Sequence, residues 1–403
     1  MNAPHELHVC IATDQNVVNL IGAVELDAKE VWILETPGMK AKKHGQHLSQ
    51  ALRSRDIRSQ RIDFPEDDPA AIRDAAIKLA EALDEQKRLP VINFTGGTKI
   101  MTLALVQQLA ELLDQGKESR PSLVYINTRQ RQLEWYSPEP SLQPMRQWLK
   151  INDLLRVNGY QHDTTTSPAS RHDKWLAIAE ERFDTTRQIV NHFAQRKTAS
   201  MNTVSFVAGK ANLAISGGFK PDQSLSKRPD KTESAYLDLL NQGGLLDFDA
   251  HGDISFRDPE SAFYCAGGWM EEYVAIQASR INQFGKQING NWRANLIPFI
   301  EGENADVKNE IDLMIAHNNR ALIVECKAAK AEDENVNDWL SKLEELANRV
   351  AGNHTGRLLV SARPLSETQL ERARLMGIGI CCGQDLLQFS NHLQSWMERG
   401  SFY

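Results

Sequence analysis

The 403-residue sequence has few cysteines, no long apolar run and no excess of positive charge, and each absence excludes a class of protein. Its five cysteines lack the paired spacing of a disulfide framework or a zinc site. Its apolar runs are far shorter than the roughly 20 residues that a membrane-spanning helix needs. The N-terminus has no basic segment followed by an apolar one, so no signal peptide is visible. We therefore expect a cytoplasmic protein with no membrane partner.

The charge and composition also limit the function. A net charge of −7 argues against a protein that coats nucleic acid. It does not exclude a nuclease, because only the substrate groove need be positive and catalytic carboxylates are required in any case. The chain is 41% hydrophobic and 25% charged, which is ordinary for a globular protein, and it is long enough for two or three domains.

Residues 7–136 alternate short apolar stretches with helical patterns. The expected strands are 7–12, 30–34, 57–62, 90–94 and 122–127, and helical patterns such as 69–83 and 100–113 lie between them. This alternation predicts an α/β fold, with a parallel sheet covered by helices on both faces. Ligands of such a Rossmann-like domain bind outside the carboxyl ends of the strands.

The pattern changes after Trp148. Residues 162–173 and 216–234 are polar and rich in turn-forming residues, so we interpret them as connections. A helix is expected over 175–195. A second helix over 235–242 followed by short strands over 245–248 and 253–256 resembles the end of a winged helix, although it could be only a spacer. We expect an N-terminal domain at 1–148, a middle segment at 149–262 and a C-terminal α/β domain at 263–403.

The C-terminal part contains the chemically most informative pattern. It begins with an expected helix from Gly267 to about Ile281, a strand near 295–299 and a hairpin, followed by a helix over 336–350 and a strand over 358–361. The hairpin consists of two apolar runs around Asn318-Asn319, and Asn tolerates the positive φ of a two-residue turn. Counting outward from this turn pairs position 312 with 325 and position 310 with 327.

This register places Asp312 opposite Glu325, with their Cβ atoms about 5 Å apart. Glu325 and Lys327 share one face of the strand, because side chains alternate. Two carboxylates this close require a cation between them. Asp with Glu-x-Lys on adjacent strands is typical of a Mg²⁺- or Mn²⁺-dependent phosphodiesterase. A structural salt bridge is the alternative, since Glu-x-Lys also occurs at Glu85-Gln86-Lys87, outside any apolar strand.

A second motif follows the expected strand at 90–94. It reads Thr95-Gly96-Gly97-Thr98-Lys99 and opens a helix. The glycines allow a turn and a close ligand, Thr98 can cap the helix, and the helix start with Lys99 attracts anions. The motif is neither a Walker A loop nor a dinucleotide fingerprint, and an ordinary strand-to-helix turn is the alternative. Thr13, Asp14, Gln15 and Asn127 end other strands and should line the same edge.

These residues resemble known families. Residues 93–101 are similar to the signature loop of CARF domains, the CRISPR-associated Rossmann fold that senses cyclic oligoadenylates. Residues 267–274, Glu310-Ile311-Asp312 and Val324-Glu325-Cys326-Lys327 resemble the PD-(D/E)xK restriction-endonuclease fold. Together the two ends of the chain resemble the ancillary effector nucleases of type III CRISPR systems.

The resemblance implies a homodimer that binds a cyclic tetra-adenylate ring across the CARF two-fold axis and then cleaves DNA or RNA. The ring would be held by Thr13, Asp14, Gln15, Asn127 and residues 95–99. The catalytic residues would be Asp312, Glu325, Lys327 and Glu271, the last preferred over Glu272. Asp312, Glu325 and Cys326 would bind Mn²⁺ or Mg²⁺. The competing hypothesis is a regulator that senses a nucleotide, binds DNA through the middle segment and has an inactive C-terminal domain.

Overall fold

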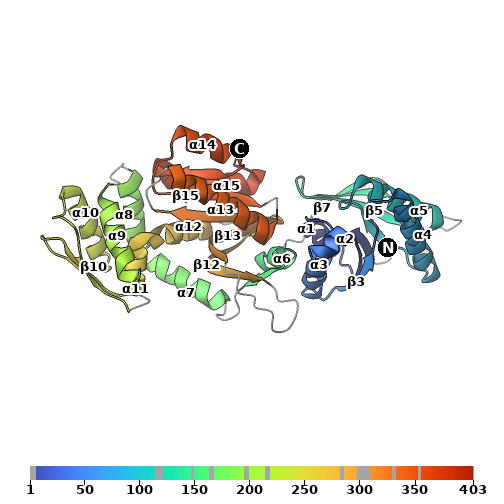
Figure 1. The fold of residues 1–403 in the computed structure, drawn as a ribbon, viewed down its shortest axis with the longest axis horizontal. Helices are drawn as coiled ribbons and strands as arrows, with labels where there is room; N and C mark the ends of the chain where they lie inside the picture. Colours follow the sequence, from blue (N-terminus) through green and yellow to red (C-terminus); the bar gives the residue numbers. More distant parts are fainter. Residues whose placement is uncertain are drawn as a thin grey trace.

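The computed structural model describes residues 6–113, 121–146, 149–162, 168–194, 199–213, 218–281, 286–296, 309–328, 333–352 and 355–402. Figure 1 shows three parts in a row. The N-terminal domain lies at one end, the C-terminal sheet in the centre and the helical middle segment at the other end. No helix within these ranges is long and apolar enough to cross a membrane. The mixed α/β fold class is confirmed.

The N-terminal sheet has the strand order β3-β2-β1-β4-β5-β6-β7. The first five of these strands are parallel and match the expected ones closely: β1 (Leu7–Ile11), β2 (Glu30–Glu35), β3 (Arg58–Asp63), β4 (Val91–Asn93) and β5 (Ser122–Asn127). Its helices are α1 (Val17–Glu25), α2 (Pro37–Ala41), α3 (His44–Arg53), α4 (Pro69–Glu85) and α5 (Lys99–Leu113). Because β1 pairs directly with β4, the order reverses between them, which is where such folds bind ligands.

Two antiparallel strands, β6 (Gln132–Ser137) and β7 (Ser141–Pro144), extend this sheet beyond β5. They were not expected from the sequence, because both are short and largely solvent-accessible and so lack a continuous apolar run. Their side chains enlarge the surface next to β5.

The middle segment differs from the prediction. Instead of one helix over 175–195 there are two, α7 (Pro168–Glu181) and α8 (Phe183–Ala194), which meet at Arg182. The linker expected over 162–173 is wrong from Pro168 onward, because α7 begins there with a proline that its first turn accommodates. Within the expected connection 216–234 lies strand β9 (Asp222–Ser224).

The rest of the middle segment has a winged-helix-like arrangement. Helices α9 (Ala199–Leu213) and α10 (Lys231–Gln242) accompany α8, and strands β10 (Leu246–Phe248) and β11 (Asp253–Phe256) form a small sheet with β9 in the order β10-β11-β9. Asp230 and Glu233 cap α10 reciprocally. The expected helix and hairpin at 235–256 are therefore present.

The C-terminal sheet has the order β16-β15-β14-β13-β12-β8. Its strands are β8 (Tyr160–His162), β12 (Gln287–Leu296), β13 (Asn309–His317), β14 (Arg320–Lys327), β15 (Gly356–Ser361) and β16 (Gly379–Cys382). The strand expected at 295–299 is instead β12, which begins at Gln287 and has a polar sequence without an apolar run. Edge strand β8 lies within residues 149–262, the expected middle segment, and only its last residue, His162, falls in the expected connection 162–173. Helices α6 (Ile151–Arg156), α13 (Asp333–Ala351), α14 (Glu367–Leu375) and α15 (Phe389–Arg399) complete this part.

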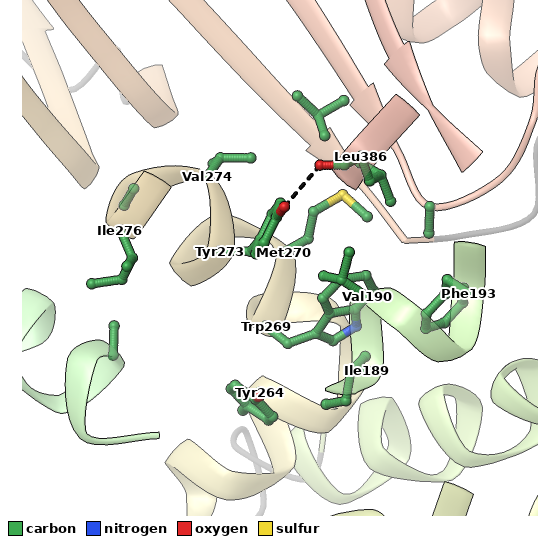
Figure 2. Close-up of a cluster of buried hydrophobic side chains, with 14 of the residues drawn as sticks. Ile189, Val190, Phe193, Tyr264, Trp269, Met270, Tyr273, Val274, Ile276 and Leu386 are labelled. Carbon is green, nitrogen blue, oxygen red and sulfur yellow. Dashed lines mark hydrogen bonds between the residues drawn. The ribbon is translucent and has the colours of Figure 1, made fainter. Parts of the chain in front are cut away.

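Helix α12 (Trp269–Arg280) lies between the C-terminal sheet and the middle helices. It follows α11 (Pro259–Phe263) and a single π-helical turn, Tyr264–Gly268. Figure 2 shows its buried face, where Trp269 stacks on Phe193 of α8 with ring centroids 5.0 Å apart. The hydroxyl of Tyr273 donates a hydrogen bond of 2.8 Å to the carbonyl oxygen of Leu386. These contacts hold α12 firmly against both neighbours.

A buried ion pair also anchors α12. Arg182, at the break between α7 and α8, donates two hydrogen bonds to the carboxylate of Glu272, one of them 2.8 Å from Nε. Burial raises the pKa of Glu272, and Arg182 opposes that rise. The arginine also lies over the ring of Tyr264, 4.6 Å from its centroid.

We predict that Arg182→Met destabilises the protein by about 3–5 kcal/mol, because it leaves the Glu272 carboxylate buried without a partner. Urea denaturation measures this change. Arg187→Met on α8 is the control, since its pair with Asp184 is exposed and should contribute less than about 1 kcal/mol. Equal losses in the two variants would contradict the anchoring role.

Candidate active site and ligand pocket

The hairpin β13–β14 has the register that the sequence predicts. Its pairs run from His317–Arg320 at the turn to Leu313–Val324, and the same count places Asp312 across from Glu325. Asn318 and Asn319 have φ values of 51° and 60°, as a type I′ turn requires. Beyond Leu313 the Asp312 carboxylate accepts a hydrogen bond of 2.7 Å from the backbone N–H of Cys326.

Three charged side chains gather at this end of the hairpin. Lys327 forms an ion pair with Glu325, which confirms that the two share one face. Burial raises the pKa of Asp312, and the nearby charge of Glu325 raises it further. Although burial opposes it, the charge of Glu325 raises the pKa of Lys327. Asp312 and Glu325 thus lie in a half-buried site where one lysine only partly balances two carboxylates.

The helix α12 adds a further carboxylate. Burial raises the pKa of Glu271, and so do the charges of Asp312, Glu310 and Glu325. Glu271 thus faces the hairpin, whereas Glu272 is bound to Arg182 on the opposite side. Gly267 has φ of 145° and lies against Ala328, which follows Lys327. The π-helical turn brings the start of α12 close to the end of β14, and π-turns of this kind are frequent at functional sites.

The donor set fits a hard divalent cation. Carboxylate oxygens are the ligands that Mg²⁺ and Mn²⁺ prefer, and the mutual repulsion of Glu271, Asp312 and Glu325 would be relieved by a cation. Within the described ranges, however, no three His, Cys, Asp or Glu side chains form a ready metal-binding group. Burial raises the pKa of the Cys326 thiol well above its usual range, and the place of Cys326 in the metal-binding set stays a prediction.

The carboxyl edge of the N-terminal sheet borders a cavity of about 610 Å³. Of the nine residues predicted to bind a ligand, five line it: Thr13, Gln15, Thr95, Gly96 and Asn127. The other four do not. Asp14 is paired with Lys42 and His44, while Gly97, Thr98 and Lys99 are exposed beside the cavity. Ile126 on β5 donates its N–H to Thr95 Oγ1 at 2.7 Å, which fixes the loop to the strand.

The Gly-Gly loop has the geometry that its sequence indicates. A Cβ at Gly96 would lie 2.9 Å from the carbonyl oxygen of Ile11, and Gly97 has φ of 88°. Thr98 caps α5, since its hydroxyl oxygen accepts a hydrogen bond from the N–H of Met101. The loop can therefore approach β1 only because both positions are glycine.

A buried asparagine network, which the sequence analysis missed, holds the loops of this pocket. Asn93 of β4 donates to the side-chain oxygen of Asn19, and Asn19 donates to that of Asn16. Asn16 in turn accepts from the N–H of Thr13 and donates to the carbonyl oxygen of His44. All three asparagines are buried. The only signal in the sequence was a set of polar residues next to apolar strands.

Family models match both ends of this chain. Residues 7–153 match the model described as "Card1 CARF domain", and residues 258–399 match the model described as "Card1-like, endonuclease domain". The chain combines a CARF domain with an endonuclease domain. This confirms the resemblance to CRISPR-associated nucleases that carry a CARF domain, whereas the PD-(D/E)xK assignment drawn from the segments around Glu271, Asp312 and Glu325 stays a prediction. The domain limits at 148 and 263 stay predictions, as do the roles of individual residues.

Solved structures share the fold over the whole chain. A protein from Vibrio cholerae, VC1899, is 20% identical, covers 98% of this chain and 99% of its own, and superposes with a TM-score of 0.82. Can2 from Sulfobacillus thermosulfidooxidans, solved with cyclic tetra-adenylate, is also 20% identical, with 98% of both chains covered and a TM-score of 0.73. A type III CRISPR defence DNA nuclease activated by cyclic oligoadenylate is 17% identical, covers 91% of this chain and 48% of its own, and has a TM-score of 0.52. No curated protein sequence matches.

We predict that Gly97→Ala in the CARF loop destabilises the protein by about 1–2 kcal/mol, because an L-residue is strained at positive φ. The added methyl group would also meet Ile11 Cδ1 at 2.6 Å. Gly209→Ala in α9 is the matched control, since nothing lies within 4 Å of its Cβ position. That change should stabilise the helix by up to about 1 kcal/mol. Thermal unfolding of both variants measures the difference, and a neutral Gly97→Ala would contradict the assigned loop geometry.

Proposed function

We propose that this protein is a metal-dependent endonuclease that a cyclic oligoadenylate, namely cyclic tetra-adenylate, activates in type III CRISPR defence. The proposal rests on the presence in one chain of two sites: a CARF pocket at β1, β4 and β5, and a half-buried cluster of Glu271, Asp312, Glu325 and Lys327. The neighbour Can2, whose structure contains cyclic tetra-adenylate, and the cyclic-oligoadenylate-activated DNA nuclease support it.

The cluster suits phosphodiester hydrolysis. Asp312 and Glu325 would hold Mn²⁺ or Mg²⁺, with Glu271 completing the carboxylate set from α12. When bound, such an ion polarises the phosphate and lowers the pKa of a water molecule. Lys327 lies beside Glu325 and would stabilise the negative charge that develops on the phosphate. The backbone N–H of Cys326 orients the Asp312 carboxylate.

The CARF pocket suits a ribose-phosphate ligand. Thr13, Thr95, Asn127 and their neighbours supply hydroxyl and amide groups, and the exposed Lys99 with the start of α5 supplies positive charge. Cyclic tetra-adenylate can shift the nuclease toward its active conformation only if it binds that conformation more tightly than the inactive one.

We expect Glu325→Ala to lower cleavage of plasmid DNA and of RNA in Mn²⁺ with cyclic tetra-adenylate by at least about 100-fold. Glu271→Gln should lower cleavage similarly, yet raise the melting temperature of the metal-free protein, because burial and the neighbouring carboxylates raise the pKa of Glu271 to about 9, so folding at neutral pH must protonate a side chain that is ionised in the unfolded protein. Gel assays and thermal unfolding measure these effects.

Glu85→Ala is the matched control for this prediction, since Glu85 belongs to the other Glu-x-Lys sequence and lies exposed on α4. Undiminished cleavage by Glu325→Ala would overturn the site. A wild-type protein that binds DNA but cleaves nothing under any cyclic oligoadenylate would favour the regulator instead.

A second copy of the chain is the proposed partner of the CARF domain. Large apolar side chains are exposed together on α5, β5, β6 and β7: Ile100, Leu103, Tyr125, Tyr136 and Leu142, with exposed fractions of 38–69%. Phe94 lies among them, 5.9 Å from the ring of Tyr125 and 6.5 Å from that of Tyr136. Adjacent apolar residues of this kind mark interaction surfaces, and this group flanks the exposed Gly97 and Lys99.

We predict that Leu142→Glu makes the protein monomeric, because a charge within an apolar interface must be desolvated. Light scattering after gel filtration measures the mass, and activation by cyclic tetra-adenylate should fall in parallel. Leu375→Glu on α14 is the control, since Leu375 is 79% exposed outside this surface. A dimeric Leu142→Glu protein, or a monomeric wild type, would contradict the proposed interface.

A further inference from the structure

The nuclease domain forms one wall of the CARF pocket. Opposite Thr13, Thr95 and Gly96, the cavity is lined by Asn319 and Arg320 from the turn of hairpin β13–β14. Arg320 lies half-buried against Gly400, where any side chain would collide with its guanidinium group. A ligand in the pocket therefore meets residues of both domains.

Positive charges face each other at this wall. Burial lowers the pKa of Arg320, and the neighbouring charge of Arg131, in the turn between β5 and β6, lowers it further. His317 is affected in the same direction by burial, then by Arg320, Arg131 and Lys286. Arg129 also lines the cavity. No carboxylate in the described part of the chain forms an ion pair with Arg320 or Arg131. The half-buried Arg320 and the exposed Arg129 both line the cavity, and the exposed Arg131 lies close enough for its charge to act on Arg320, so this wall suits an anion.

The hairpin turn is also fixed to the CARF domain. The backbone N–H of Leu149 donates a hydrogen bond of 2.7 Å to the side-chain oxygen of Asn319. The side-chain nitrogen of Asn319 lies 3.5 Å from Met145 Sδ. The N–H of Met145 donates to the carbonyl oxygen of Arg131. Contacts of Met145 with Asn319 and with Arg131 thus connect the hairpin turn that carries Arg320 to the turn that carries Arg131.

The same two strands lead from the pocket to the catalytic cluster. His317 lies five positions along β13 from Asp312, and Arg320 lies five positions along β14 from Glu325, which is about 17 Å along each strand. Residues 313–317 and 321–324 are buried, and both strands are central in the sheet. The hairpin is therefore a stiff element that has the pocket at one end and the carboxylates at the other.

We propose that Arg320, which lines the pocket, binds a phosphate of the cyclic oligoadenylate while the charge of the nearby Arg131 adds to the attraction, so that the activator contacts the nuclease hairpin directly as well as the CARF domain. This inference rests on the proposed function. It assigns the link between the two sites to a single hairpin, and it makes Arg320 a positioning residue rather than a catalytic one.

The test uses full-length Arg320→Gln and Arg131→Gln in Mn²⁺ with cyclic tetra-adenylate. Each variant should weaken ring binding by about 10-fold to 100-fold, as expected for a lost charge-assisted hydrogen bond. Arg320→Lys should recover part of the loss. Without the ring, both variants should be at least as stable as wild type, because a repulsion is removed. A purely structural arginine would instead lower stability without the ring and leave affinity unchanged.

Arg374→Gln is the control, since Arg374 is exposed on α14 and paired with Glu371. Calorimetry measures the affinity for cyclic tetra-adenylate, and thermal unfolding measures the stability. Gel assays of cleavage measure the concentration of cyclic tetra-adenylate that gives half-maximal activation. If wild type is activated and Arg320→Gln responds at the same ring concentration, the inference is wrong and the proposed function stands. If wild type responds to no cyclic oligoadenylate, the proposed function fails and the inference fails with it.

Discussion

The repulsion between half-buried carboxylates at the end of hairpin β13–β14 is the constraint on which the active-site end of the molecule depends. Glu271, Asp312 and Glu325 come from a helix and two strands, and only Lys327 among the described residues carries compensating charge at the cluster. Such a cluster persists because the elements around it are held by other contacts: the Trp269 stack, the Tyr273 hydrogen bond and the Arg182–Glu272 pair. Stability elsewhere in the domain sustains a locally unfavourable site.

The parts predicted well from sequence were those set by local rules. The hairpin register followed from two asparagines at a tight turn, and the parallel strands followed from apolar runs between helical patterns. The cap at Thr98 and the shared face of Glu325 and Lys327 required only the geometry of one element. Each of these features depends on residues that are close in sequence, which is why it could be predicted from one amino-acid sequence.

The parts that were missed depend on contacts between distant segments. Strand β12 has a polar sequence and exists because β13 and β8 pair with it on both sides. The break at Arg182 is held by its bond to Glu272, 90 residues away in sequence. The pocket wall at Asn319 and Arg320 arises only when the CARF and nuclease domains pack together. No local sequence pattern indicates contacts between segments that are distant in sequence, so the part of the ligand pocket formed by the nuclease domain could not be predicted.

The position of strand β8 limits where the chain can be cut or joined to another domain. The strand lies only a few residues beyond helix α6, yet it forms the outer edge of the endonuclease sheet by pairing with β12. Removing everything upstream of α11 would leave the backbone groups of Ala294, Asn295 and Leu296 in β12 without their strand partner, and an exposed strand edge invites aggregation. The nuclease unit is therefore not a contiguous module that recombination or truncation can exchange intact. Chimeras that swap sensors in this architecture should join the chain before Tyr160, not at the start of the endonuclease segment.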